Sequence, residues 1–353
     1  MLRLNGVALE RSSQGRVFRR RMREQREKVV DLPRLTSEQL RIMNVEPVGY
    51  SQEARQIYEK LGHLEEGPVS RLELMSIVSK YDVILVRLTH QIDKDILERA
   101  QRLRVIVTPT TGLDHIDLDA AEAAGVTVLS LRDEGEFLTQ ISATAEHTWG
   151  LLLALTRRIP WAFEHVLSGG WNRDQFRGID LSGRRIGLLG LGRIGGMVAG
   201  YARSFGMKVT AFDPYRHGWV DGVGRAMSAE ALMSESDILS VHVHLTPKTQ
   251  GLLGKDLLRH MPARSLVVNT SRGGVLVEDD LVEMLEAGHV AGAAVDVLLN
   301  ERGGQVSPLL DYAIRNQNLI ITPHIAGATT EAMERTEIHM ARMLAGYLQG
   351  DPE

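Results

Sequence analysis

Residues 185–196 read RIGLLGLGRIGG, an apolar run that leads directly into three glycines with the spacing G-x-G-x-x-G. The apolar run predicts a buried strand, and the glycines predict a tight turn into a helix. Gly190 permits the bend, Gly192 lets a pyrophosphate approach the backbone, and Gly195 lets the helix pack closely on its strand. The free N–H groups at the helix N-terminus would face the phosphates. This stretch therefore predicts the first strand, turn and helix of a dinucleotide-binding domain.

A carboxylate follows the next predicted strand, which covers residues 208–212 and ends on Asp213, eighteen residues past Gly195. At that distance the carboxylate is placed to accept hydrogen bonds from a ribose 2'-OH, and it would repel the 2'-phosphate of NADP. The sequence therefore favours NAD as the cofactor. The structural alternative is an α/β turn that binds no ligand.

The composition is that of an ordinary globular protein, with 353 residues, 43% hydrophobic residues, 24% charged residues and a formal net charge of -4. This charge gives no reason to expect nucleic acid or an anionic membrane as a partner. Because the chain has no cysteine, disulfides, thiolate metal sites and cysteine nucleophiles are excluded, and the histidines lack metal-ligand spacing. We find neither an apolar run of about eighteen residues nor the core of a secretory signal, and we therefore expect a cytoplasmic protein.

The N-terminal part of the chain divides into a basic lead-in and a region of alternating strands and helices. Residues 1–33 are a predicted basic extension, interpreted as a solvated segment that contacts a partner subunit rather than as a nucleic-acid arm. From Leu40 onward, repeated strand–helix units predict a parallel sheet with helices on both faces. Strands are expected at 42–45, 83–86, 105–107 and 126–129, and helices at 52–61, 70–80, 93–102 and 117–124.

The second half of the chain predicts a larger domain. Residues 142–158 are apolar nearly all round, which predicts a long helix buried between domains. The last helix, at 330–348, is expected to return to the first domain. The predicted class is α/β with two doubly wound parallel-sheet domains: a Rossmann NAD domain at 142–325 inserted in a smaller, flavodoxin-like substrate domain at 34–141 and 326–353. Further strands are expected at 238–243, 266–269, 290–297 and 319–322.

Three charged or titratable residues fall beyond predicted strand ends, where open parallel sheets bind ligands: Arg272, Glu301 and His324. This set fits hydride transfer to a 2-oxo acid. The arginine would bind the substrate carboxylate and polarise the carbonyl, and the histidine would donate a proton to the oxygen. The glutamate would orient the imidazole and stabilise its protonated form. Each residue also has a structural interpretation: a histidine that closes the sheet, a surface arginine and a solvated glutamate.

The sequence also resembles the D-isomer-specific 2-hydroxyacid dehydrogenases, the family of phosphoglycerate, glyoxylate and D-lactate dehydrogenases. The resemblance extends from about Val83 to Leu348 and implies NAD-dependent interconversion of a D-2-hydroxy acid, such as 3-phosphoglycerate or a related small acid, and its 2-oxo acid. It also implies a homodimer. The matching stretches are GLLGLGRIGG at 187–196, VHVHLTP at 241–247, VNTSRGG at 268–274, AVDV at 294–297 and ITPHIAGAT at 321–329.

The resemblance implies roles for individual residues. Arg272, Glu301 and His324 match the catalytic arginine, glutamate and histidine of the family. The substrate would be held by Arg87, Thr111, Gly112 and Arg272. The cofactor would contact Gly190, Gly192, Arg193, Ile194, Gly195, Asp213, His244, Thr270, Ser271, Arg272, Asp296, His324 and Gly327.

Departures from the family pattern leave the substrate and two other functions open. Animal phosphoglycerate enzymes often have an arginine at the place of Thr108 and a serine at Leu88, so a phosphorylated substrate is less favoured, although Arg87 remains. Glu301 argues against formate dehydrogenases, which have glutamine there. The alternatives are an NAD-sensing corepressor that binds peptides and an enzyme that oxidises phosphite or another small anion. Because few residues follow the last helix, we expect no appended regulatory domain.

Overall fold

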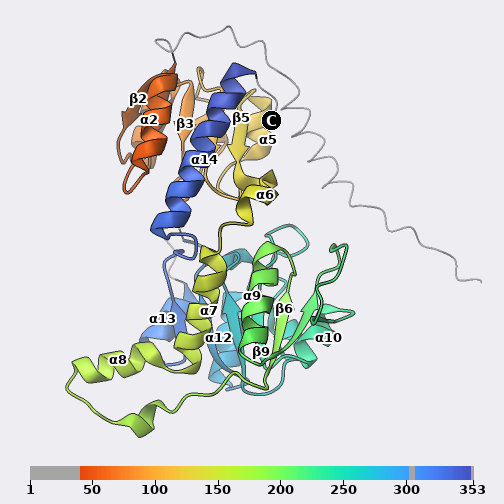
Figure 1. The fold of residues 1–353 in the computed structure, drawn as a ribbon. Coiled ribbons are helices and arrows are strands. Elements are labelled where there is room, and N and C mark those ends of the chain that lie inside the picture. The colour runs from red at the N-terminus through yellow and green to blue at the C-terminus, as the bar shows by residue number, and fades with distance from the viewer. Residues whose placement is uncertain (1–39, 302–306, 351–353) are drawn as a thin grey trace, which may run out of the picture. The chain divides into compact units, whose positions relative to one another are not determined.

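A computed structural model describes residues 40–301 and 307–350 of the protein, which fold into two compact units (Figure 1). The smaller unit comprises Met1–Asp133 with Glu334–Glu353, and the larger unit comprises Glu134–Met333. The predicted basic extension at 1–33 lies outside the described residues. The expected domain limits, at 142 and 325, stay a prediction.

A five-stranded parallel sheet forms the smaller unit, in the order β2-β1-β3-β4-β5. This is the flavodoxin-like order, as predicted. One strand was not expected, because its sequence HLEE has a single apolar residue; it lies at the edge of the sheet, where polar side chains are tolerated. The strands are β1 Arg41–Asn44, β2 His63–Glu66, β3 Val83–Leu85, β4 Val105–Thr108 and β5 Thr127–Ser130.

Capping residues set the helix starts of the smaller unit. Ser70 and Glu73 form a capping box at the start of the helix expected at 70–80. The helix expected at 93–102 is shorter in the structure, because the N–H of Ala100 bonds three residues back to Leu97 and the chain continues as turns. The helical segments are α2 Gln52–Leu61, α3 Arg71–Ile77, η1 Val78–Lys80, α4 Lys94–Leu97, α5 Leu118–Ala123, η2 Leu131–Asp133 and the last helix, α14 Thr330–Gln349.

The last helix joins the N-terminal part of the chain within the smaller unit. In Figure 1, α14 and α2 lie side by side over the sheet, and a salt bridge of 2.8 Å connects Arg342 to Glu53. The hydroxyl of Tyr347 lies 3.0 Å from Oγ1 of Thr127 on β5. Thr127 and Tyr347, which are 220 positions apart in the sequence, thus lie together in the smaller unit.

The larger unit is built on a seven-stranded parallel sheet, in the order β12-β11-β10-β9-β6-β7-β8. The order reverses between β6 and β9, and this switch point is where doubly wound sheets bind dinucleotides. All strands that the sequence predicted are present, and the two-residue edge strand β8 is additional. The strands are β6 Arg185–Leu189, β7 Lys208–Phe212, β8 Gly224–Arg225, β9 Ile238–Val241, β10 Ser265–Asn269, β11 Val290–Val295 and β12 Leu319–Ile321.

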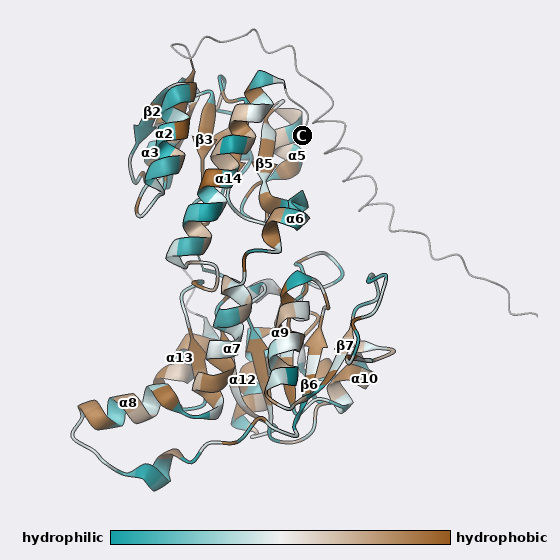
Figure 2. Ribbon diagram, viewed as in Figure 1, coloured by the Kyte–Doolittle hydropathy of each residue, from teal (hydrophilic) through white to brown (hydrophobic). Residues whose placement is uncertain are grey.

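Helices cover both faces of this sheet, because successive strand residues point to opposite sides. On β10, Val267 packs with the α12 side of the core and Val268 with the α7 side. Figure 2 shows the apolar strands of β6 and β9 between the helices. The helical segments are α6 Gly135–Leu138, α7 Ala143–Thr156, α8 Ile159–Leu167, η3 Arg173–Phe176, α9 Arg193–Ser204, α10 Ala229–Ser234, α11 Lys255–Leu258, η4 Gly273–Val275, α12 Glu278–Glu286 and α13 Pro308–Arg315.

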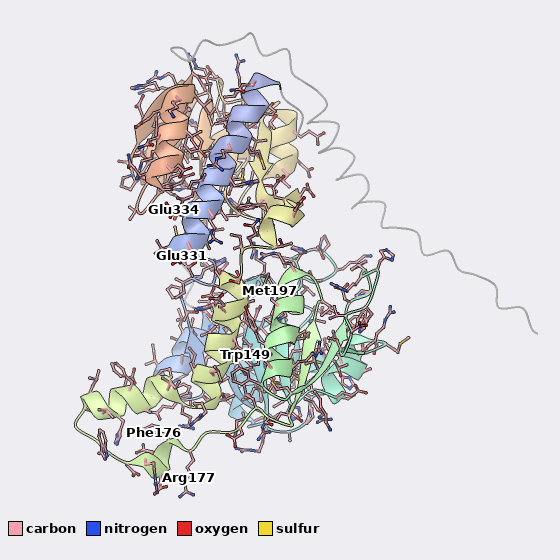
Figure 3. The ribbon with its side chains drawn as sticks, in the orientation of Figure 1. Trp149, Phe176, Arg177, Met197, Glu331 and Glu334 are labelled. Atoms are coloured by element: carbon pink, nitrogen blue, oxygen red, sulfur yellow. The ribbon has the colours of Figure 1, made fainter. Side chains whose placement is uncertain are left out.

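The long apolar helix of the sequence is α7, and its buried side chains belong to the core of the larger unit; its expected place between the domains stays a prediction. It packs against β10, β11, β12 and α9. Trp149 of α7 stacks edge-on against Phe205 at 4.9 Å between ring centroids, and Figure 3 labels it beside Met197 of α9. The all-round apolar sequence therefore serves the core of this unit.

A segment of α8 and the chain after it, which we call the arm (residues 159–179), projects from the larger unit (Figure 1). No helix is predicted here from the sequence, which has a Gly- and Trp-rich loop at 169–171. The ring of His165 lies 5.1 Å from that of Phe176, and its Nε2 accepts a hydrogen bond from the N–H of Asn172. Figure 3 labels Phe176 and Arg177 on the segment that returns after α8, and Figure 2 shows the apolar turns of α8. Its exposed large apolar side chains are Ile159, Phe163, Val166, Leu167, Trp171 and Ile179.

Residues 40–301 and 307–350 contain neither a membrane-spanning helix nor a metal-binding cluster. None of the helices there has the length and apolar character needed to cross a membrane. Nor does that part of the chain hold a group of three or more acidic or histidine side chains placed to bind a metal ion.

Candidate active site

The glycine-rich turn connects β6 to α9, and its first and third glycines are required by close backbone contacts. Gly190 has a φ of +94°, and a Cβ there would lie 2.7 Å from the carbonyl oxygen of His242. A Cβ on Gly195 would lie 2.3 Å from the carbonyl oxygen of Gly190. At Gly192, in contrast, a Cβ would meet no atom within 4 Å. The space that a pyrophosphate needs at the second glycine is therefore present.

The N-terminus of α9 provides the anion-binding end of this turn. Gly192 precedes the first helical residue, so the first N–H groups of a 12-residue helix point out of the turn. The guanidinium of Arg193 donates to the carbonyl oxygens of Leu138 at 3.2 Å and Ile141 at 2.5 Å. Ile194 packs against the core. The backbone thus fits a pyrophosphate, whereas the Arg193 side chain holds residues 138–141.

Asp213 stands directly after β7, beside the glycine-rich turn. Its Oδ2 accepts the N–H of Leu191 at 2.9 Å, and its Oδ1 accepts the N–H of Tyr215 at 3.0 Å. Each carboxylate oxygen keeps a further lone pair for a ribose hydroxyl. The guanidinium of Arg216 donates to the carbonyl oxygen of Leu191. These residues fit an NAD molecule with its pyrophosphate at α9 and its adenosine ribose at Asp213.

A histidine and a glutamate pair beyond the ends of β11 and β12. Nδ1 of His324 lies 2.6 Å from Oε2 of Glu301, and the side chains are 22% and 27% exposed. The carboxylate accepts a hydrogen bond from the N–H of Nδ1, so Nε2 is the ring atom left to exchange a proton with a substrate. His324 has a left-handed φ of +53° and donates its N–H to the carbonyl oxygen of Asp296. Tertiary contacts thus impose this backbone conformation.

Arg272 lies in the turn between β10 and α12. Its Nη1 donates to the carbonyl oxygen of Ser271 at 2.7 Å, and its own carbonyl accepts from the side chain of Asn269. Ser271 donates its hydroxyl to Asn269 as well. The neighbouring Thr270 is buried, and its hydroxyl lies 2.7 Å from that of Thr148 on α7. The turn that carries the arginine is therefore rigidly hydrogen bonded.

Asp296 is buried, and its carboxylate braces the loop that carries His324. Oδ1 accepts the hydroxyl of Thr322 at 2.6 Å and the N–H of Ile325 at 2.9 Å, and Oδ2 accepts the N–H of Ala326 at 2.8 Å. Nε2 of His147 on α7 lies 3.3 Å from Oδ1. The contact of Asp296 with the nicotinamide, implied by the resemblance, stays a prediction.

His147 is a residue of this region for which the sequence predicts no role. The signal that was available is its polar side chain on an otherwise apolar helix. His242, in contrast, is a structural histidine: burial lowers its pKa to about 4, so it is neutral at pH 7. Two other predicted cofactor residues lie in loops beyond strand ends: His244 is exposed after β9, and Gly327 follows His324 where a Cβ would meet no atom within 4 Å.

The predicted substrate residues of the smaller unit follow β3 and β4. The guanidinium of Arg87 donates to the carbonyl oxygens of Glu46 at 2.5 Å and Val48 at 2.8 Å, and it lies 3.4 Å from Glu337. After β4, the hydroxyl of Thr110 donates to the carbonyl oxygen of Gly112 at 2.8 Å, which shapes the loop containing Thr111. In this structure Arg87 thus contacts other residues of its own unit.

Comparison with known proteins gives matches over most of the chain. Residues 149–326 match the family model described as the NAD binding domain of D-isomer specific 2-hydroxyacid dehydrogenases. A D-3-phosphoglycerate dehydrogenase of Methanocaldococcus jannaschii is 34% identical over 304 residues, which cover 85% of this chain and 56% of that protein. A glyoxylate reductase of Thermofilum pendens is 37% identical over 294 residues, covering 81% and 84%.

A solved structure gives the same result. The crystal structure of D-lactate dehydrogenase from Aquifex aeolicus, complexed with NAD and lactic acid, superposes with a TM-score of 0.74 at 26% identity and covers 88% of this chain and 96% of that one. The chain spans about half the length of the phosphoglycerate dehydrogenases that it matches. Because the family model matches half of the chain and the glyoxylate reductase matches over most of both lengths, the chain belongs to the D-isomer specific 2-hydroxyacid dehydrogenase family.

Proposed function

We propose that the protein is an NAD-dependent oxidoreductase that interconverts a D-2-hydroxy acid and its 2-oxo acid. The observation that carries this proposal is the 2.6 Å contact between Nδ1 of His324 and Oε2 of Glu301. The pair stands at the carboxyl edge of the sheet whose glycine-rich turn fits a dinucleotide. A carboxylate-oriented histidine beside a nicotinamide site is suited to proton exchange with an alcohol or carbonyl oxygen.

In the reduction direction, each residue of the set has one task. NADH, when bound, supplies the hydride that forms the C–H bond at C2. The guanidinium of Arg272 binds the substrate carboxylate and polarises the carbonyl. His324 gives the proton on Nε2 to the carbonyl oxygen, which yields the hydroxyl, while Glu301 keeps the proton on Nδ1 and stabilises the ring's positive charge before transfer.

The substrate class that we propose is a small 2-oxo acid. The named relatives include a glyoxylate reductase, a D-3-phosphoglycerate dehydrogenase and a D-lactate dehydrogenase with lactic acid bound. Arg87 would have to release Glu46 and Val48 before its guanidinium bound a phosphate. For this reason we place unphosphorylated acids ahead of 3-phosphohydroxypyruvate.

The test is turnover, followed as loss of NADH absorbance across a panel of 2-oxo acids. The panel contains glyoxylate, hydroxypyruvate, pyruvate, 3-phosphohydroxypyruvate and bulkier branched or aromatic acids. We expect turnover with a small member of the panel, abolished by Arg272→Ala. Tight NADH binding without turnover on any acid would reject this function and favour an NAD-sensing module that binds a partner protein.

We also propose that the protein forms a homodimer through the arm. In support, Phe163, Leu167 and Trp171 are 62%, 71% and 89% exposed, and a monomer rarely leaves so many large apolar side chains in water on one element. Light scattering after gel filtration should give a dimer mass for the wild type and a monomer mass for Phe163→Asp. A monomeric wild type would reject the proposal.

A cytoplasmic location stays a prediction from the sequence.

A further inference from the structure

Glu278, the first residue of α12, is a buried carboxylate beside the loop that carries Glu301. It is 8% exposed. Its Oε1 accepts the N–H of Leu299, and its Oε2 accepts the hydroxyl of Ser307, both at 2.7 Å. Leu299 precedes Glu301 and Ser307 follows it. One carboxylate therefore holds the chain on both sides of the glutamate that pairs with His324.

We propose that Glu278 is a positioning residue that fixes the carboxylate of Glu301 against the imidazole of His324. The inference rests on the proposed function, in which His324 exchanges the proton. Glu278 contacts neither ring nor substrate in this arrangement; it acts through the backbone of Leu299.

The link from Glu278 to the ring passes through two consecutive backbone N–H groups. The N–H of Leu299 bonds to Glu278, and that of Leu298 bonds to Oε1 of Glu301 at 3.1 Å. The other oxygen of Glu301 makes the 2.6 Å contact with His324. A shift of Leu299 therefore moves the donor that sets the orientation of the Glu301 carboxylate.

The same backbone is packed against the turn that carries Arg272. A Cβ on Gly273 would lie 2.0 Å from the carbonyl carbon of Leu298 and 2.5 Å from the nitrogen of Leu299. This contact blocks movement of residues 298–299 toward the turn. The hydrogen bonds from Leu299 and Ser307 to Glu278 restrain the other displacements of these two residues.

A purely structural role for Glu278 would be to stabilise the N-terminus of α12 as an acidic residue in the first turn. Asp279, the next residue, also lies in this turn but is exposed. Asp279→Asn therefore removes the same charge from the same helix end without touching residues 298–307, and it is the matched control.

The experiment compares Glu278→Ala, Glu278→Gln and Asp279→Asn by the pH profile of kcat/KM for 2-oxo-acid reduction. In Glu278→Ala we expect the basic limb to move to lower pH and kcat/KM to fall on the order of tenfold, with the KM for NADH unchanged. Glu278→Gln should recover most of the loss, because its amide can accept from Leu299 and donate to Ser307. Asp279→Asn should match the wild type.

Two results would overturn the inference. Equal displacement of the basic limb in the Ala and Gln variants would mean that Glu278 acts by charge and not by position. An unmoved basic limb in Glu278→Ala would mean that Glu278 does not position Glu301. If the Ala variant does not fold, Glu278→Asp carries the same test, because its shorter side chain withdraws the carboxylate from the N–H of Leu299 without a change of charge; an unmoved limb there has the same meaning.

A second readout separates this inference from the proposed function. The titration midpoint of the His324 ring is followed by NMR in the ligand-free protein, without any turnover. If the wild type reduces none of the acids, the proposed function fails, while a lower midpoint in Glu278→Ala than in Asp279→Asn still supports positioning. The same midpoint in both variants would reject it.

Discussion

Charged side chains lie at the carboxyl edges of both sheets, but their partners and their exposure to solvent differ. In the smaller unit, the carboxylate of Glu46 follows β1 and accepts the N–H groups of Arg87 at 3.1 Å and Thr89 at 3.2 Å, and its side chain is only 9% exposed. In the larger unit, Glu301 and His324 pair with each other and remain about one quarter exposed. The first arrangement uses its charged groups to fix loop structure, and the second leaves the ring that we propose to exchange a proton partly exposed to solvent.

Two carboxylates of the smaller unit show how the number of hydrogen-bond donors decides a pKa. Burial alone would raise the pKa of Glu46, but hydrogen bonds from His90, Arg87 and Thr89 outweigh it and lower the pKa to about 2. Burial also raises the pKa of Glu337, and the N–H of Ser51 and the charge of Arg87 compensate only in part, which leaves the pKa at about 7. Charged residues in this unit should therefore govern stability, and those in the larger unit should govern activity.

The largest effect should come from the ring itself. We expect His324→Ala to lower kcat/KM by about a thousandfold, because no other group supplies the proton in the transition state. NADH affinity, measured by fluorescence titration, should not change. His260→Ala, which removes an exposed histidine of the same unit, is the control and should leave both quantities as they are. A decrease of kcat/KM smaller than tenfold in His324→Ala would contradict the comparison.

The next effect concerns stability in the smaller unit. Glu337 is 1% exposed, and its pKa rises from 4.5 to about 7 on folding. Between these pH values the folded state keeps a proton that the unfolded state has lost. The contribution of Glu337 to the free energy of unfolding is therefore complete below about pH 4.5 and falls by about 3 kcal/mol as the pH rises to 7. Urea unfolding at both pH values should show this loss, and Glu337→Gln should abolish it.

The control for this experiment is Glu331→Gln, an exposed glutamate on the first turn of the same helix, α14 (Figure 3). It removes the same charge from a position in contact with water. If the pH dependence of unfolding were unchanged in Glu337→Gln, or lost in Glu331→Gln, the buried carboxylate would not be its source.

The smallest effect should come from Glu301→Gln. The amide keeps the shape of the side chain but removes the negative charge beside the imidazole, and we expect kcat/KM to fall by about tenfold. The basic limb of the reduction profile should move to lower pH, because the protonated ring loses its anionic partner. Glu286→Gln, an exposed change in the same unit, should leave the profile in place. An unmoved basic limb in Glu301→Gln would remove Glu301 from this role.

Regular elements were predictable where the sequence carries a strong local pattern. Buried parallel strands are continuous apolar runs, and those of β3, β6 and β10 stand within a residue or two of their expected limits. β2 was missed because it is polar and lies at an edge, and α8 was missed because the preceding helix was expected to end before Pro160 and no element was assigned directly after it. Edge and surface elements depend on neighbours that a local pattern does not contain.

The sequence alone determined the class of fold, the glycine-rich turn and the identity of the arginine, glutamate and histidine beyond the strand ends. The apolar runs, the turn glycines and the residue types that follow each strand are all local signals in the chain. Only the tertiary structure decided which groups hold that set in place. Asp296 reaches Thr322 across 26 residues, and Glu278 reaches Ser307 across 29. Such contacts depend on how separate loops pack at one sheet edge, and no spacing within a single segment encodes them.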